Sequence, residues 1–251
     1  MQKIAEVKAE IERRAQVRYA QEQADYAAKQ ADRAAKEQAR GRKLGSQPPQ
    51  EPTPGPRPKD QVNFTDEDSR IMPSAGGGFE QAHHAQATVD RATLLVVGAH
   101  VTQHANDKQE VEPALEELTT RPKDLGQVKR AALDNGYYSQ NNVEALADHG
   151  IEPFIAVGRQ SHYEALEERL APVPEAPKNA DAVGAMKHRL KTPEDKAFYA
   201  KRKSTVEPVF GLIKEAMGFR RFLLRGLEAV KGEWRWVCLA FNLKRLCALR
   251  A

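Results

Sequence analysis

One carboxylate stands at the point where a predicted strand ends. Residues 128–133 form a short apolar run, and Asp134 follows it directly, ahead of the turn sequence Asn135-Gly136. In open α/β sheets reactive side chains gather at the carboxyl ends of strands, because they project there into a crevice. Asp134 is therefore a candidate for catalysis or metal binding. The alternative is structural, since an Asp before Asn-Gly commonly serves only to form the turn.

A second carboxylate lies among cations in a segment with a helical pattern. On one helix, side chains four or seven residues apart share a face, and this face would carry Tyr199, Lys203, Glu207, Phe210 and Lys214. Such an arrangement suits a site where the carboxylate holds a metal and the lysines meet phosphates. The alternative is a set of weak surface ion pairs. Pro208 predicts either a kink or a helix that restarts with Pro208 at its first position.

The elements that must position these residues begin with a long amino-terminal helix. Residues 2–41 are rich in Ala, Glu, Gln, Lys and Arg and have only a weak apolar face, which predicts an exposed helix. Six prolines between Gly45 and Asp60 predict a semi-rigid extended linker, and the glycines at 76–78 predict a turn into a strand. We therefore predict an exposed helical segment at 1–44, a Pro/Gly-rich linker at 45–78 and a globular domain at 79–251.

The globular part alternates between strand and helix patterns. Residues 93–102 are apolar and mostly β-branched, as in a strand buried on both faces, and 85–90 would form a hairpin with them. Ser139 is a predicted helix N-cap, and Gly150 would end that helix. The class is mixed α/β, with further elements predicted as helix 108–120, strand 128–133, helix 139–148 and strand 154–157.

The remainder of the chain has a helical pattern. A loop with prolines at 172, 174 and 177 precedes a helix at 179–190. Thr192-Pro193 predicts the cap and first turn of a long helix that runs to about Met217. In the last helix, 228–249, one apolar face would contain Val230, Trp234, Val237, Cys238, Phe241, Leu243 and Leu246.

Basic charge is concentrated in this last part. Residues 184–251 hold 16 basic and 6 acidic side chains, whereas 1–183 hold 23 basic and 29 acidic ones. Such a region is typical of a phosphate-binding surface, although a solvated helical surface is the alternative. No apolar run is long enough to cross a bilayer, and no secretory signal is visible. The two cysteines are typical of buried thiols in a reducing cytoplasm, and the seven histidines show no metal-ligand spacing.

Five stretches of the sequence occur together in one known family. They are Asn106-Asp107, Leu133-Asp134-Asn135-Gly136-Tyr137-Tyr138, the nine residues Val-Glu-Pro-Val-Phe-Gly-Leu-Ile-Lys at 206–214, Gly-Phe-Arg-Arg-Phe at 218–222, and Asn-Leu-Lys-Arg-Leu at 242–246. In this combination the chain resembles the DDE-type transposases of bacterial insertion sequences, over roughly residues 62–250.

The resemblance implies a ribonuclease-H-like core whose Asp, Asp and Glu hold two divalent metal ions, Mg²⁺ or alternatively Mn²⁺. It makes Asp134 the second aspartate and Glu207 the glutamate, both catalytic and metal-binding. The activity would be DNA strand cleavage and transfer by a cytoplasmic, nucleoid-associated protein. Its partner would be DNA, as transposon ends and as target, with no membrane, and a homodimer is left open. The expected DNA contacts are Tyr199, Lys201, Arg202, Lys203, Lys214, Arg220 and Arg221.

The chain departs from the family pattern at the front of the core. There the first aspartate would stand on an opening strand, before the hairpin at 85–102, but no buried strand precedes Asp66, Asp68 or Asp90. We therefore expect a truncated chain whose sheet lacks its first strand and which does not cleave DNA. One alternative is a catalytically inactive DNA-binding fragment of a transposase. The other is an unrelated helical interaction protein.

Overall fold

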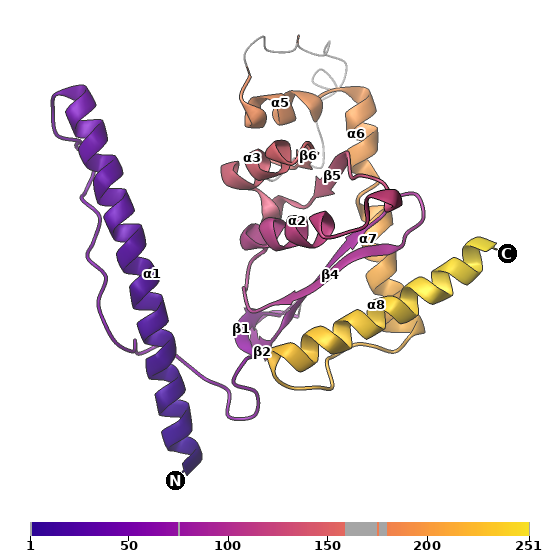
Figure 1. Cartoon of the computed structure of the whole chain (residues 1–251), viewed down its shortest axis with the longest axis horizontal. Helices are drawn as coiled ribbons and strands as arrows, with labels where there is room; N and C mark the ends of the chain where they lie inside the picture. Colours follow the sequence, from indigo (N-terminus) through magenta and orange to yellow (C-terminus); the bar gives the residue numbers. More distant parts are fainter. Residues whose placement is uncertain (1, 75, 159–174, 176–179, 251) are drawn as a thin grey trace. The chain divides into compact units, whose positions relative to one another are not determined.

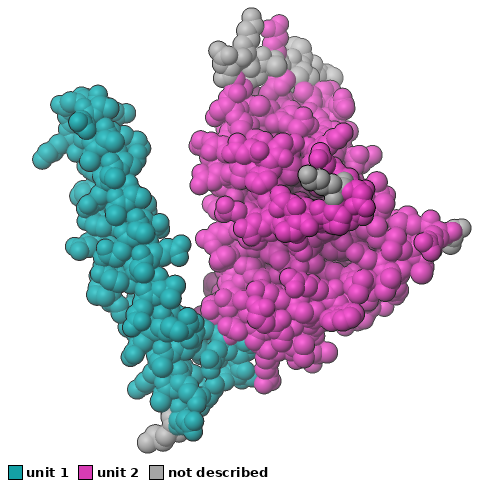
Figure 2. All heavy atoms as spheres, in the orientation of Figure 1, with its two compact units in different colours: residues 1–67 teal, residues 68–251 magenta. Residues whose placement is uncertain are grey.

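The computed structural model describes residues 2–74, 76–158, 175 and 180–250 (Figure 1). The chain divides into two compact units, Met1–Glu67 and Asp68–Ala251 (Figure 2). The predicted loop with prolines at 172, 174 and 177 lies outside the described residues, apart from residue 175. None of the helices in the described ranges is long and apolar enough to cross a membrane.

The first unit is a helix with an extended segment folded back along it. Helix α1 spans Gln2–Arg40, close to the predicted range, but Val7 and Ala15 are buried rather than exposed. Near its end, Arg33 donates to the carbonyls of Leu44 and Gln47, at 3.0 Å each. Toward its start, Arg18 pairs with Asp60 at 2.7 Å and donates to the carbonyl of Gly55 at 3.1 Å. The prolines keep this segment extended, and arginines of α1 satisfy its carbonyls.

Two antiparallel hairpins open the second unit. Strand β1 (Arg70–Pro73) pairs with β2 (Phe79–Ala82) across the predicted glycine turn. The sequence pattern missed β1, because it is short and carries one buried side chain. The predicted hairpin at 85–102 is confirmed as β3 (His84–Val89) and β4 (Val96–Thr102). Its second strand begins later than predicted, because Leu94 adopts a positive φ of 59° in the turn.

The predicted alternation of helix and strand is also confirmed. In chain order it consists of α2 (Val111–Thr119), β5 (Arg130–Leu133), α3 (Gln140–Asp148) and β6 (Glu152–Ile155). The Ser139 side chain caps α3 by accepting from the N–H of Asn142. Strands β5 and β6 are parallel. The mixed α/β class holds. The strands of the described ranges form three two-stranded sheets, and the ribonuclease-H-like arrangement stays a prediction.

The long helix predicted from Thr192 to Met217 is wrong as one element. Thr192 does cap the start, but the helix is interrupted after α6 (Pro193–Ala200). It resumes as α7 (Lys203–Gly211), which continues directly into a π-helical stretch (Leu212–Ala216). Helix α6 ends because Lys201 and Arg202 donate to carbonyls only three residues back. Pro208 lies inside α7, so the predicted restart at Pro208 is also wrong. The preceding α5 (Ala182–Arg189) falls within the predicted range.

Two apolar clusters stabilise the second unit. One joins α2, α3, α5 and β6 around Val143, Phe154, Ile155 and Met186. The other joins the β3–β4 hairpin to α7 and to the last helix, α8 (Leu227–Arg250), around Val209 and Trp234. Helix α8 packs along β4 (Figure 1) through one face only. Leu243 and Leu246, which were predicted on this face, are instead 56% and 43% exposed.

Candidate functional site around Asp134

Asp134 occupies the position that the sequence predicts, immediately after β5. Its side chain is 59% exposed, and one carboxylate oxygen accepts a hydrogen bond from the N–H of Asn135 at 2.7 Å. That bond caps a single 3-10 turn at Asn135–Tyr137. Asp134 therefore forms the turn and at the same time keeps its carboxylate exposed.

The junction between α6 and α7 is tied to the same strand end. The Tyr199 hydroxyl donates to the carbonyl of Leu133 at 3.1 Å, and the Arg202 guanidinium lies 3.4 Å from the Asp134 carboxylate. Arg202 is only 18% exposed and lies over the Tyr199 ring. Burial raises the pKa of the Tyr199 hydroxyl, with Arg202 opposing the shift, so it stays a neutral donor. Both residues, expected to contact DNA, here anchor α6–α7 beside Asp134.

Glu207 lies on α7, five residues after Arg202, and its side chain is exposed. At about 1.5 Å per residue, this places it about 7.5 Å along the helix axis from the residue that pairs with Asp134. Lys203 lies one turn before Glu207 on the same helix, whereas Tyr199 belongs to α6 and Lys214 to the π-helical stretch. The single five-residue face predicted for a continuous helix is therefore not formed.

The remaining expected DNA contacts are exposed cations. They are Lys201, Lys203, Lys214, Arg220 and Arg221. Lys214 stands over the Phe210 ring, and Arg220 pairs with Glu215. Because all five residues are exposed, their charged ends can reach an anionic partner.

A polar network that the sequence pattern did not reveal supports the turn after Asp134. The side-chain amide of Gln86 on β3 donates through its nitrogen to an Asp107 oxygen at 2.9 Å, and its oxygen Oε1 accepts from the Tyr137 hydroxyl. The other Asp107 oxygen lies 2.8 Å from where a Cβ on Gly136 would stand. Asp107 belongs to one of the motif stretches, but spacing alone could not show that it meets residues 21 and 29 positions away.

We predict that a side chain at Gly136 is destabilising because of this contact. Its φ is not positive, so its backbone would tolerate alanine, and the only obstacle is Asp107. We expect Gly136→Ala to lower the free energy of unfolding by about 1–2 kcal/mol. In urea titrations, Gly136→Ala should add no further loss to Asp107→Ala. Gly211→Ala, in α7 with no atom near its new methyl group, is the control and should not destabilise. Additive losses in the double variant would contradict the account.

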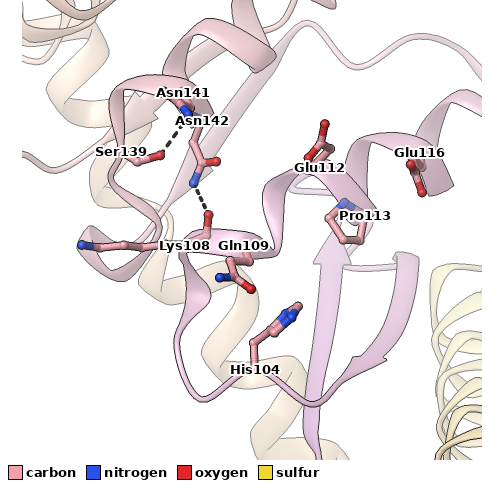
Figure 3. A pocket seen from close by; sticks show the side chains of 9 residues that line it. All are labelled: His104, Lys108, Gln109, Glu112, Pro113, Glu116, Ser139, Asn141 and Asn142. Carbon is pink, nitrogen blue, oxygen red and sulfur yellow. Dashed lines mark hydrogen bonds between the residues drawn. The ribbon is translucent and has the colours of Figure 1, made fainter. Parts of the chain in front are cut away.

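An open hollow of about 440 Å³ lies beside this network, between the starts of α2 and α3 (Figure 3). Asn142 closes one side by donating from its amide to the carbonyls of Lys108 at 2.9 Å and Tyr137 at 2.7 Å. Lys108, Glu112 and Glu116 contribute opposite charges to the lining. The hollow is thus an open surface depression next to the Asp134 turn, with a mixed polar and apolar lining.

Two of the histidines that the sequence left without a role hold a buried carboxylate. Glu110 is 1% exposed, and its two oxygens meet His100 at 3.0 Å and His104 at 2.7 Å. Burial alone would raise the pKa of Glu110, but the hydrogen bonds from His100, His104 and Thr102 outweigh it and lower that pKa. The charged carboxylate therefore joins β4 to the start of α2.

Two of the three other aspartates considered at the front of the core have structural partners. Asp68 accepts from the N–H of Leu227 at 2.8 Å, at the start of α8. Asp90 accepts from the N–H and hydroxyl of Thr93 at 2.8 and 2.6 Å and so forms the hairpin turn. Asp66 belongs to the first unit. Across the described ranges, no three His, Cys, Asp or Glu side chains are grouped closely enough to hold a metal ion.

Comparison with known proteins identifies one match. A family model described as "Transposase DDE domain" matches residues 52–243, which is more than half of the chain. No match was found among curated proteins or among solved structures.

Proposed function

The chain belongs to the transposase DDE domain family, and from that premise we propose that it is the DNA-handling part of an insertion-sequence transposase. The observation that carries the proposal is the family match together with the exposed cations on both sides of Glu207 between α6 and α8. DNA as the partner is in keeping with the family, and association with the bacterial nucleoid would follow from it.

In this proposal Asp134 and Glu207 are the second aspartate and the glutamate of the DDE set. Arg202 supports their proximity, because it pairs with Asp134 at 3.4 Å and begins the helix that carries Glu207. In the family, Mg²⁺ or Mn²⁺ would supply the strand-cleaving chemistry. The carboxylates of the described ranges do not form a complete site for such ions, so we assign no cleavage step to this chain.

The DNA-binding step is assigned to the cations themselves. Lys201 and Lys203 lie on either side of Arg202 at the α6–α7 junction, and Lys214 follows in the π-helical stretch after α7. These side chains would neutralise phosphates and release counterions, which makes binding strong at low salt and independent of sequence. Tyr199 and Arg202 would act indirectly, by holding the junction against β5.

A second candidate function is DNA binding without any cleavage by this chain. The Arg202–Asp134 ion pair favours it, because a guanidinium already neutralises the carboxylate that a metal ion would need. The two candidates share the DNA-binding surface. They differ in whether Asp134 and Glu207 belong to a metal-binding set, as in the first candidate, or have only structural roles, as in the second.

We predict that the purified 251-residue chain binds duplex DNA but does not nick it in Mg²⁺ or Mn²⁺. Binding is measured by fluorescence anisotropy over a range of salt concentrations, and nicking by gel electrophoresis of a supercoiled plasmid. The control is Glu207→Gln, which should bind duplex DNA with the affinity of the parent chain and should likewise leave the plasmid uncut. Nicking by the parent that Glu207→Gln abolishes would show that a third ligand exists. Absence of DNA binding at low salt would contradict the proposed function itself.

A further inference from the structure

The outward side of α8 carries an apolar stripe that the core does not use. Trp236, Leu239, Leu243 and Leu246 follow one another at intervals of three, four and three residues. Their exposed fractions are 72%, 46%, 56% and 43%. The core-facing side chains of α8 are others, namely Val230, Trp234, Cys238 and Phe241. We call the four exposed residues the α8 outer stripe.

Two further leucines extend this surface. The Glu233 carboxylate accepts from the backbone N–H of Leu223 at 3.0 Å and of Leu224 at 3.0 Å. Glu233 stands one turn before Trp236, so the two leucines lie beside the beginning of the stripe. They are 72% and 52% exposed. The combined apolar surface is on the order of 500 Å², at which size an exposed patch commonly marks an interaction site.

The spacing of the stripe fits another helix with the same spacing. Apolar residues at alternating intervals of three and four form the a and d seam of a helix pair. We infer that the α8 outer stripe is a self-association surface, on which α8 of a second copy of this chain packs. Burial of the surface on both copies would remove about 1,000 Å² from water, near the lower limit for a specific interface. The dimer should therefore be reversible, with a dissociation constant in the micromolar range.

The charges along α8 select an antiparallel arrangement. The second half of the helix carries Lys244, Arg245 and Arg250 and no acidic residue. The first half carries two carboxylates, Glu228 and Glu233, and two cations, Lys231 and Arg235, so it has no net charge. A parallel pair would place the three cations of one copy beside the same three cations of the other, and the carboxylates beside each other. An antiparallel pair places each basic half beside the electrically neutral first half of the other copy, which avoids this repulsion, and it also opposes the helix dipoles. In its central register Leu239 of one copy faces Leu243 of the other.

Sedimentation equilibrium of the full chain at increasing concentration tests this inference. We expect a monomer–dimer equilibrium, with a dissociation constant raised at least about tenfold by Leu239→Lys and by Leu243→Glu. Leu125→Lys is the control, because Leu125 is 71% exposed outside the stripe, and it should leave the equilibrium unchanged. A parent chain that stays monomeric, or a dimer insensitive to both stripe variants, would overturn the inference.

Mixing the two stripe variants, Leu239→Lys and Leu243→Glu, tests the antiparallel register. The introduced lysine of one chain would face the introduced glutamate of the other, so the mixture should form a heterodimer although neither variant associates alone. Lack of a heterodimer would overturn the antiparallel arrangement. A second measurement uses the parent chain and needs no stripe variant. A thiol reagent labels Cys247, which is exposed at the edge of the stripe, and the labelling rate is followed. Its labelling rate should fall as the parent concentration rises, and a constant rate would count against self-association.

Discussion

Replacing five exposed cations with glutamine should reduce the affinity for duplex DNA at least about 100-fold at low salt. The slope of log affinity against log salt should also fall, by as much as about 0.9 for each residue replaced. The residues are Lys201, Lys203, Lys214, Arg220 and Arg221. The physical reason is counterion release, because each lost phosphate contact leaves one condensed cation on the DNA. Fluorescence anisotropy at several salt concentrations gives both quantities.

The matched control removes equal charge from the first unit. Five exposed cations of that unit are replaced with glutamine, namely Lys8, Lys29, Arg40, Arg42 and Lys43. If net charge alone governed binding, the two variants would lose affinity equally. The account requires the control to retain most of the affinity and most of the salt slope. Equal losses would show that the five cations of the second unit have no special part in DNA binding.

Trp234→Ala should lower the free energy of unfolding by about 3–5 kcal/mol, the usual loss for a fully buried aromatic side chain. Trp234 is 2% exposed and stacks on Phe210, with ring centroids 5.7 Å apart. Its indole N–H donates to the carbonyl of Gln86 on β3 at 2.9 Å. The substitution therefore opens a cavity and leaves a buried acceptor without its partner. Urea unfolding measures the change.

Trp236→Ala is the matched control on the same helix. Trp236 is 72% exposed and points away from the core, so its loss should change the free energy of unfolding by less than about 0.5 kcal/mol. The measurement is made at low concentration, where self-association through the α8 outer stripe does not contribute. Comparable losses at Trp234 and Trp236 would contradict the packing of α8 described above.

The elements with strong local signals could be predicted from the sequence. The β-branched run at 93–102, the Ser139 cap and the Thr192 cap each led to the element that the structure contains. Predictions failed where tertiary contacts outweighed the local pattern. The helical pattern continues through Lys201 and Arg202, but the helix is interrupted there. At this point Tyr199 is hydrogen-bonded to Leu133 and Arg202 is paired with Asp134, both at the end of β5. Likewise, the apolar pattern of α8 could not show which of its two apolar stripes faces β4.

The candidate site could be predicted only in its local part. The strand-end position of Asp134 follows from the residues around it. The Arg202–Asp134 pair joins residues 68 positions apart, and the Gln86–Asp107 bond crosses 21. No periodicity encodes contacts at such separations, because they depend on how elements pack. For the same reason the roles of His100 and His104 around Glu110 were not foreseen.

The most direct test of the central claim is the distance between positions 134 and 207, because the account requires both carboxylates to belong to one site. Spin labels are attached at Asp134→Cys and Glu207→Cys in a Cys247→Ser background, and the distance is measured by pulsed electron paramagnetic resonance. Cys238 can stay, because burial raises the pKa of its thiol to about 12 and leaves it unreactive. The account predicts a single distance below about 25 Å. A distance near 40 Å, about the diameter of a domain of this size, would contradict it.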